Sequence, residues 1–120
     1  MIDFQKFIKS TTFAIKGIGS MIKSENNARI HLLASVLVIS AGFYFQLNLQ
    51  EWLWISLAIT LVWILEALNT AIEAIIDLVS PEFHPLAGKA KDIAAGAVLI
   101  ASIFALIVGT IIFLPKVLLL

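Results

Sequence analysis

Residues 93–114 read IAAGAVLIASIFALIVGTIIFL and contain no charged side chain. A helix needs about 20 mostly apolar residues to cross a bilayer, so this stretch alone predicts a transmembrane helix. Two further apolar stretches, at about 31–49 and 52–79, are also long enough to cross. The sequence therefore predicts an all-α, polytopic membrane protein in which residues 1–120 form a single domain with three transmembrane helices.

The composition supports this fold class. Of the 120 residues, 61% are apolar and 13% are charged, whereas soluble domains have about 45–50% apolar and about 25% charged residues. Eight basic side chains balance eight acidic ones, and there is no cysteine. The balanced charge argues against a nucleic-acid partner. The lack of cysteine excludes disulfides and thiolate chemistry.

The first 23 residues predict a helix of a different kind. At about 100° per residue, one face of this helix is apolar and the lysines gather on the opposite face. The apolar arc spans roughly 140° and comprises Phe4, Phe7, Ile8, Ile15, Ile18, Met21 and Ile22. Such a helix lies on the surface of an anionic leaflet, and its four lysines do not fit a secretory signal peptide. Gly17 and Gly19 predict a break near its end.

The predicted connections give an orientation. Asn48–Glu51 predicts a tight hairpin, and Ser80–Asp92, which contains two prolines and a glycine, predicts a loop. The N-terminal segment and this loop together carry seven Lys and Arg residues, whereas the other side carries only Lys116. The positive-inside rule therefore places the N-terminus and residues 81–92 in the cytoplasm.

Four polar side chains interrupt the second predicted transmembrane helix. Glu66, Asn69, Glu73 and Asp77 fall within a stripe about 80° wide on one helix face. Each acid costs at least about 2.5–3.5 kcal/mol at the centre of a membrane helix. Three acids therefore favour catalysis or ion handling over helix packing or a proton relay. The stripe runs towards the predicted cytoplasmic end, which indicates a site reached from the cytosol.

These side chains match the groups that phosphoryl transfer requires. Glu66 lies deepest and suits a general base that acts on a lipid hydroxyl. Glu73, together with Glu25, suits Mg²⁺, which takes one or two carboxylates plus phosphate oxygens. Lys91 can offset phosphate charge, with Asp92 beside it to orient the ammonium or a metal-bound water. Taken alone, Glu25 is equally a helix-terminus acid, and Lys91 is a positive-inside charge.

The sequence contains none of the common nucleotide or hydrolase motifs. It lacks a Walker A motif and a kinase Gly-rich loop, as well as HExxH and GxSxG. Its two histidines, His31 and His84, are too far apart to favour a zinc site. A kinase here would need an unusual site built within the membrane. His84 is interpreted first as a loop residue near the headgroups, and among the N-terminal lysines only Lys6 is considered for phosphate contact.

Small residues recur every four positions in the third predicted transmembrane helix. They are Ala97, Ala101, Ala105 and Gly109. Small residues let helices approach closely. Because three helices alone enclose a polar stripe poorly, we hypothesise a homo-oligomer that buries Glu66 and Glu73 at subunit contacts.

Two segments resemble the bacterial diacylglycerol kinase and undecaprenol kinase family of small integral-membrane lipid kinases. One is Glu66–Glu73, which reads EALNTAIE and is followed by Asp77, and the other is residues 88–92, which read GKAKD. The resemblance covers nearly the whole chain. It implies three transmembrane helices, a surface helix, a homotrimer with shared active sites, and MgATP-dependent phosphorylation of a lipid alcohol in the bacterial plasma membrane.

The resemblance also implies roles for individual residues. Glu66 is the expected catalytic base, and Glu25 and Glu73 are the expected Mg²⁺ ligands. The expected contacts to the nucleotide and its phosphates are Asn69, Lys91 and Asp92. The residues expected to line the rest of the ATP site are Lys6, Phe13, Glu82, Phe83 and His84.

The identity of the lipid and two other functions stay open. Arg29–His31 and Ile111–Pro115 look more like undecaprenol kinases, and Ala95 stands where diacylglycerol-specific relatives tend to have Ser. Undecaprenol is therefore slightly favoured over diacylglycerol. A small proton-coupled exporter would use Glu66 to carry protons, but it would not need the Lys91–Asp92 pair. A membrane assembly subunit would explain the small residues but not the acids.

Overall fold

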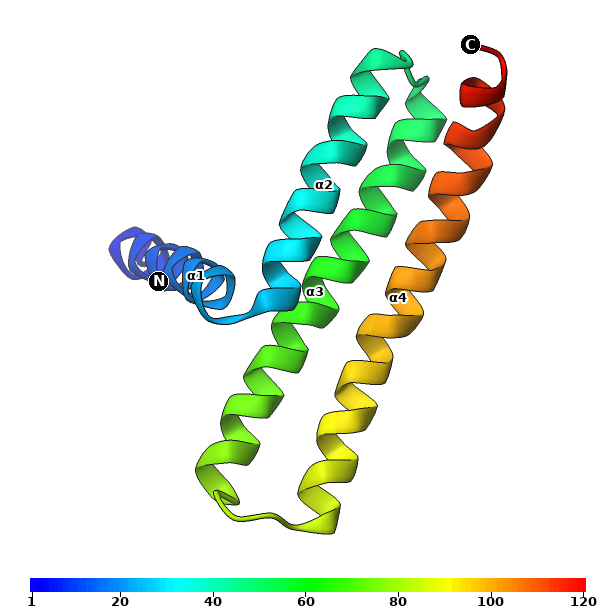
Figure 1. The fold of residues 1–120 in the computed structure, drawn as a ribbon. Coiled ribbons are helices and arrows are strands. Elements are labelled where there is room, and N and C mark those ends of the chain that lie inside the picture. Colours follow the sequence, from blue (N-terminus) through cyan, green and yellow to red (C-terminus); the bar gives the residue numbers. More distant parts are fainter.

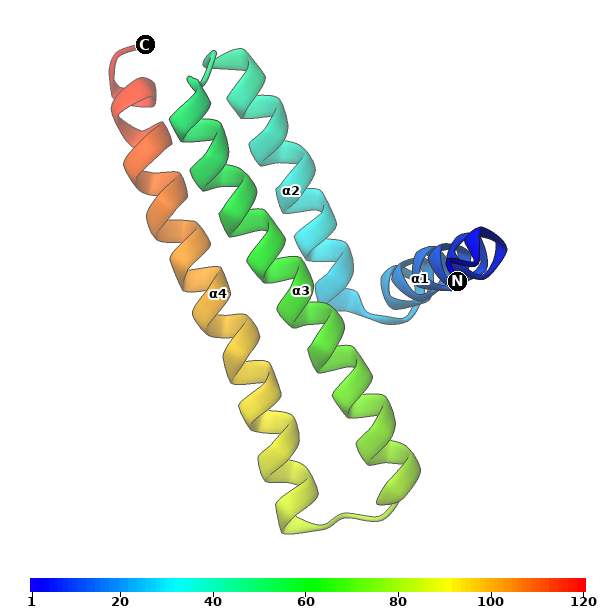
Figure 2. The same ribbon diagram turned by 180° about the vertical axis from the view of Figure 1, so that it is seen from behind.

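A computed structural model describes all 120 residues, which form four α-helices. The helices are α1 (Phe4–Ser24), α2 (Asn26–Tyr44), α3 (Leu49–Val79) and α4 (Pro85–Leu118). Helices α2, α3 and α4 lie side by side in alternating directions, and α1 projects crosswise from them (Figures 1 and 2). Each of α2, α3 and α4 is long and apolar enough to cross a membrane. The predicted all-α fold with three membrane-spanning helices is confirmed.

The bundle has a three-helix end and a two-helix end. Figure 1 shows that α2 begins beside the middle of α3, while α3 and α4 continue past it to their own connecting turn. The contact between α3 and α4 is the most extensive in the chain. Side chains near the middle of α3 therefore lie beside the first turns of α2.

The hydrophobic core is small and lies near the α2–α3 turn. It comprises Leu47, Ile55, Ala58, Val108 and Ile112, with Phe45, Trp52, Phe104 and Phe113 among the side chains packed around it. Only 14 of the 120 residues are buried. Most apolar side chains of the spanning helices are thus exposed on the single chain. Exposed apolar surface of this extent is typical of helices that face lipid or another subunit.

The start of α3 is fixed by a capping box. The Glu51 N–H donates to Asn48 Oδ1 at 2.9 Å, and the Asn48 N–H donates to Glu51 Oε1 at 3.1 Å. Lys116 Nζ, near the end of α4, lies 3.1 Å from Glu51 Oε2. Because these contacts satisfy the first turn, α3 begins at Leu49 rather than at 52. The hairpin correspondingly occupies residues 45–48, where Gln46 has a left-handed backbone with a φ of 54°.

The first turns of α4 correct the predicted loop. Pro85 starts the helix, where its missing N–H has no intrahelical partner to lose. The His84 Nδ1 accepts a hydrogen bond from the Leu86 N–H at 3.1 Å. The connection is therefore limited to residues 80–84, and the charged side chains near residue 90 lie on a helix. At its other end α4 runs to Leu118, past the predicted end at 114.

The junction of α1 and α2 is a bend at Glu25 that is held by Arg29. The Arg29 Nε donates to the Ile22 carbonyl at 3.0 Å, and Nη2 donates to the Lys23 carbonyl. The guanidinium thereby satisfies carbonyls at the end of α1 that have no partner within the helix. Helix α2 starts directly after the bend, at Asn26, five residues before the predicted start at 31.

Helix α1 is continuous, so the predicted break near Gly17 and Gly19 is wrong. Each glycine weakens a helix by only about 1 kcal/mol relative to alanine, and α1 extends over 21 residues. Most of its apolar arc is exposed. Phe13 lies on the lysine face, with its ring centroid 5.8 Å from Lys16 Nζ. These features agree with a helix that lies on a membrane surface.

Gly42 on α2 lies in close contact with Trp52 on α3, whereas the other glycines have open space beside them. A Cβ atom built on Gly42 would lie 2.5 Å from Cη2 of Trp52. We predict that Gly42→Ala lowers the free energy of unfolding by about 1–3 kcal/mol, because the indole must shift within a packed cluster. Equilibrium unfolding in mixed micelles measures this. Gly17→Ala is the control, since nothing lies within 4 Å of its Cβ; equal stability of both variants would contradict the prediction.

Candidate functional site

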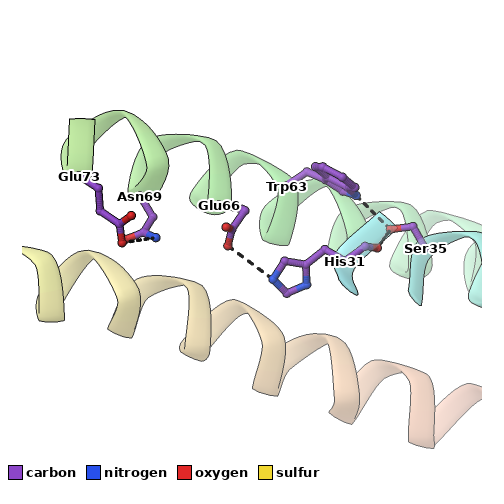
Figure 3. A network of polar contacts seen from close by, with 6 residues as sticks. All are labelled: His31, Ser35, Trp63, Glu66, Asn69 and Glu73. Carbon is purple, nitrogen blue, oxygen red and sulfur yellow. Dashed lines mark hydrogen bonds and ion pairs between the residues drawn. The ribbon is translucent and has the colours of Figure 1, made fainter. Parts of the chain in front are cut away.

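Glu66 is the only large side chain that is fully buried, and it lies near the middle of α3. Its side chain is 1% exposed. The nearest charged or polar partner is His31 on α2, whose Nε2 lies 3.5 Å from Glu66 Oε2 (Figure 3). Burying a carboxyl group away from water is unfavourable unless other polar groups compensate. The fold therefore concentrates a substantial cost at this residue.

The polar stripe predicted for α3 becomes more exposed from Glu66 towards the α3–α4 turn. Asn69 is buried, Glu73 is half-buried, and the Asp77 side chain is 67% exposed. Asn69 Nδ2 donates to Glu73 Oε1 at 3.3 Å, as expected for polar side chains one turn apart. The stripe therefore forms a polar path from the buried carboxyl group to one end of the bundle.

Three buried oxygens within this region lack a hydrogen-bond partner. They are Glu66 Oε2, Asn69 Oδ1 and Thr70 Oγ1. Folded proteins leave few buried polar atoms unpaired, and here all three fall within five residues of α3. The Asn69 amide nitrogen donates to Glu73, whereas the amide oxygen accepts no hydrogen bond. Two of these residues, Glu66 and Asn69, line the same cavity, which makes this part of α3 the candidate binding site.

A cavity of about 250 Å³ opens beside Glu66. Its polar wall comes from α2 and α3, and its opposite wall comes from α4. The lining residues are Asn27, Ile30, His31, Glu66, Asn69, Ala95, Val98, Leu99 and Ser102. The cavity is large enough for a polar group of a substrate.

A second cavity, of about 280 Å³, adjoins the first and is mainly apolar. The two share His31 and Ser102 among their lining residues. The second is otherwise lined by Ala34, Ser35, Val38, Ile59, Val62, Ala105 and Leu106. Together they form a polar cavity next to an apolar one, and Glu66 lies in the wall of the polar cavity.

Lys91 pairs with a different acid from the one expected. Its Nζ lies 2.5 Å from Asp77 Oδ1 and so joins α4 to the exposed end of the stripe. Asp92 follows it by about 100° around the helix. Asp92 lines a shallow hollow with Phe83, Pro85, Gly88, Lys89 and Ile93. Lys91 and Asp92 do not pair within the chain, because adjacent helical residues point in different directions. The other expected role of Asp92, to orient a metal-bound water, stays a prediction.

The other expected site residues are spread over the chain. Glu25 is half-buried at the α1–α2 bend and is close enough to Glu66 to interact with its charge. The connection that carries Glu82, Phe83 and His84 begins about 20 Å along α3 from Glu66, at 1.5 Å per residue. Lys6 and Phe13 belong to the exposed face of α1, which projects from the bundle. No cluster of three His, Asp or Glu side chains could hold a metal ion within this one chain.

The structure adds residues that sequence reasoning missed. His31 contacts Glu66, and Ser35 Oγ accepts a hydrogen bond from Trp63 Nε1 at 3.0 Å (Figure 3). His31 and Ser35 lie one turn apart in an otherwise apolar stretch, which is a weak sign of a shared polar face. Their partners on α3 cannot be found from spacing, since the contacts join residues 28 or more positions apart.

Comparison with known proteins agrees with this arrangement. A model of the prokaryotic diacylglycerol kinase family matches residues 12–113. The chain is 42% identical to an undecaprenol kinase of Bacillus subtilis, over 95% of this chain and 93% of that protein. It is 43% identical to a diacylglycerol kinase of Synechocystis, over 91% of this chain and 63% of that protein. A diacylglycerol kinase of Escherichia coli is 34% identical, over 87% of this chain and 85% of that protein.

These relatives give no support to the exporter or to the assembly subunit, since all three are named as kinases. The match to the family model covers most of the chain. It includes both segments that carry the resemblance, Glu66–Asp77 and residues 88–92. With three helices able to cross a membrane, the chain is a multi-pass membrane protein that belongs to the prokaryotic diacylglycerol kinase family.

Proposed function

We propose that the protein is a lipid kinase that transfers the γ-phosphate of ATP to the hydroxyl group of a membrane lipid alcohol. The observation that carries this proposal is the buried Glu66 carboxyl group in a polar cavity that adjoins an apolar one. A lipid alcohol has the matching form, since its hydroxyl group fits beside the carboxylate and the part of its hydrocarbon chain next to the hydroxyl group fits the apolar cavity, with the rest of the chain in the bilayer. The names of the relatives support the same reaction class.

In the proposed reaction Glu66 acts as general base. Its carboxylate accepts the hydroxyl proton while the lipid oxygen bonds to the γ-phosphorus and the bond from that phosphorus to the β–γ bridging oxygen breaks. The products are the lipid phosphate and ADP, and the proton is later released to water. Lys91, at the exposed end of the stripe, is placed to offset phosphate charge by exchanging its Asp77 partner for phosphate oxygens.

The oxygen donors of the site fit Mg²⁺. Glu25 and Glu73 supply carboxylates, and Asn69 Oδ1 is a buried acceptor without a partner. Mg²⁺ usually takes one or two carboxylates, with phosphate and water completing its shell, so a site short of a full protein cage suits it. When bound, Mg²⁺ would neutralise charge on the phosphate oxygens. We propose Glu25 and Glu73 as its protein ligands.

A homotrimer with shared sites would bring the remaining nucleotide residues together. In one chain Lys6 and Phe13 lie on the projecting α1, and Glu82, Phe83 and His84 lie at the α3–α4 turn. The polar stripe is covered by α2 over only part of its length, and most apolar side chains of the spanning helices are exposed. A neighbouring subunit would cover these surfaces and add its own nucleotide contacts.

We place the N-terminus and the α3–α4 turn in the cytoplasm of a bacterial plasma membrane. Lysines lie on α1 and at the start of α4, whereas Lys116 lies at the other end of the bundle. This distribution follows the positive-inside rule. The exposed end of the stripe then opens towards cytosolic ATP, and Glu66 lies deeper, within reach of lipid.

Undecaprenol is the slightly favoured lipid. The similarity to an undecaprenol kinase extends over nearly the full length of both proteins, and Ala95, which lines the polar cavity, differs from the Ser expected in diacylglycerol-specific relatives. We predict transfer of radiolabelled γ-phosphate from MgATP to undecaprenol in mixed micelles, faster than to diacylglycerol offered in parallel. Transfer to neither lipid by a well-folded protein would refute the kinase proposal, and faster transfer to diacylglycerol would reverse the substrate assignment.

Glu66→Gln tests the general base. We expect kcat for lipid phosphorylation to fall by about 10²–10⁴-fold, the usual contribution of general base catalysis, with KM for MgATP little changed. Steady-state kinetics with saturating lipid measures both constants. Glu51→Gln makes the same chemical change at the other end of α3, where Glu51 pairs with Lys116, and it should keep kcat. A Glu66→Gln variant with near-normal kcat would remove Glu66 from this role.

Glu73→Gln and Glu25→Gln test the metal ligands. Replacing a carboxylate by a neutral amide weakens Mg²⁺ binding, so each variant should need a higher Mg²⁺ concentration for half-maximal activity. The measurement is a titration of Mg²⁺ at fixed ATP and lipid, with Glu51→Gln again as the control. Titration curves that coincide with that of the unmodified protein in both variants would exclude these residues as ligands.

A further inference from the structure

We infer that His31 is a positioning residue that holds the Glu66 carboxylate in the orientation that accepts the lipid proton. The inference rests on the proposed function, because it gives His31 a purpose only if Glu66 is the base. It gives α2 a part in catalysis. Neither the polar stripe on α3 nor the expected nucleotide contacts include such a part.

The contact between His31 and Glu66 selects one carboxylate oxygen. His31 Nε2 lies 3.5 Å from Glu66 Oε2, and Oε2 is the Glu66 oxygen that is buried without a hydrogen-bond partner. The neighbouring amide of Asn69 donates one hydrogen of Nδ2 to Glu73 Oε1 and makes no hydrogen bond to Glu66. With the imidazole facing Oε2, the other oxygen, Oε1, is left for the lipid hydroxyl. A modest approach of the two groups would turn the present ion-pair distance into a hydrogen bond.

Ser35 and Trp63 connect the backbone of His31 to α3. The Ser35 hydroxyl donates to the His31 carbonyl at 2.7 Å and accepts from Trp63 Nε1 at 3.0 Å. A hydroxyl has one hydrogen to donate and an indole has one N–H, so the direction of both bonds is determined. Figure 3 shows the resulting chain of contacts from Trp63 through Ser35 to His31 and Glu66.

The geometry of the two helices turns these bonds into an alignment device. Ser35 follows His31 by four residues on α2, and Glu66 follows Trp63 by three residues on α3, so each pair shares one helix face. Two polar contacts one turn apart set both the rotation and the axial position of α2 relative to α3. These contacts fix the start of α2 against α3, while the Gly42–Trp52 packing and the short turn fix its other end.

His31→Leu and His31→Gln test the inference together. The leucine removes the N–H, and we expect kcat to fall by about 10- to 100-fold, the scale of a misplaced catalytic group, with KM for MgATP unchanged. The glutamine places an amide N–H near the position of Nε2, and we expect it to restore most of kcat. A merely structural role would not produce a loss confined to kcat that an N–H donor rescues.

Serine variants supply a matched control on the same helix. Ser40 donates to the Val36 carbonyl at 2.7 Å, as Ser35 does to that of His31, but Ser40 accepts nothing from α3. We expect Ser35→Ala to lower kcat and Ser40→Ala to leave it unchanged. Trp63→Phe, which keeps an aromatic ring but loses the N–H, should behave like Ser35→Ala. These variants carry the test if His31→Leu does not fold, as judged by circular dichroism and size-exclusion chromatography.

The outcomes separate this inference from the proposed function. Wild-type kcat in His31→Leu, or equal impairment of the leucine and glutamine variants, would overturn the positioning role while the kinase proposal stands. Should His31→Leu be unfolded, wild-type kcat in both Ser35→Ala and Trp63→Phe would overturn it as well. If the unmodified protein transfers phosphate to neither lipid, the proposed function fails and the inference fails with it.

Discussion

The burial of one carboxyl group, that of Glu66, is the constraint on which the rest of the arrangement depends. A carboxyl group in an apolar helix bundle is unfavourable unless polar groups face it. The chain meets this demand in part with His31 from α2, whereas the nearby acids Glu25 and Glu73 add like charge and leave the cost only partly compensated. Because His31 lies in the first turns of α2, the position of α2 along α3 determines whether the imidazole reaches Glu66.

The unequal lengths of the helices then divide the molecule into two parts. Where α2, α3 and α4 run together, the core of Ile55, Ala58 and Val108 packs tightly, and Trp52 closes over Gly42. Beyond the start of α2, only α3 and α4 remain paired, and the polar stripe becomes progressively exposed up to the ion pair of Lys91 with Asp77. The buried carboxyl group lies between the apolar part and the polar part, which in the proposed reaction is where a lipid hydroxyl group would meet the phosphate donor.

A single chain supplies the proposed base but leaves the expected nucleotide contacts apart. The surface helix α1 carries some of them, and the α3–α4 turn carries others. The same chain leaves most of its apolar side chains uncovered. A neighbouring subunit would answer both deficits, and this is why we treat the proposed homotrimer as part of the proposed catalytic unit.

The sequence by itself determined the helical class, the three spans and the face on which Glu66, Asn69 and Glu73 lie, because each depends on local composition and on the helical period. It located helix ends less well: Pro85 and Gly88 indicated a loop, whereas capping at His84 made them the start of α4. Only the tertiary structure paired Lys91 with Asp77 and brought His31, Ser35 and Trp63 together beside Glu66. Such contacts depend on how helices pack against one another, and residues distant along the chain carry no periodic signal of their meeting.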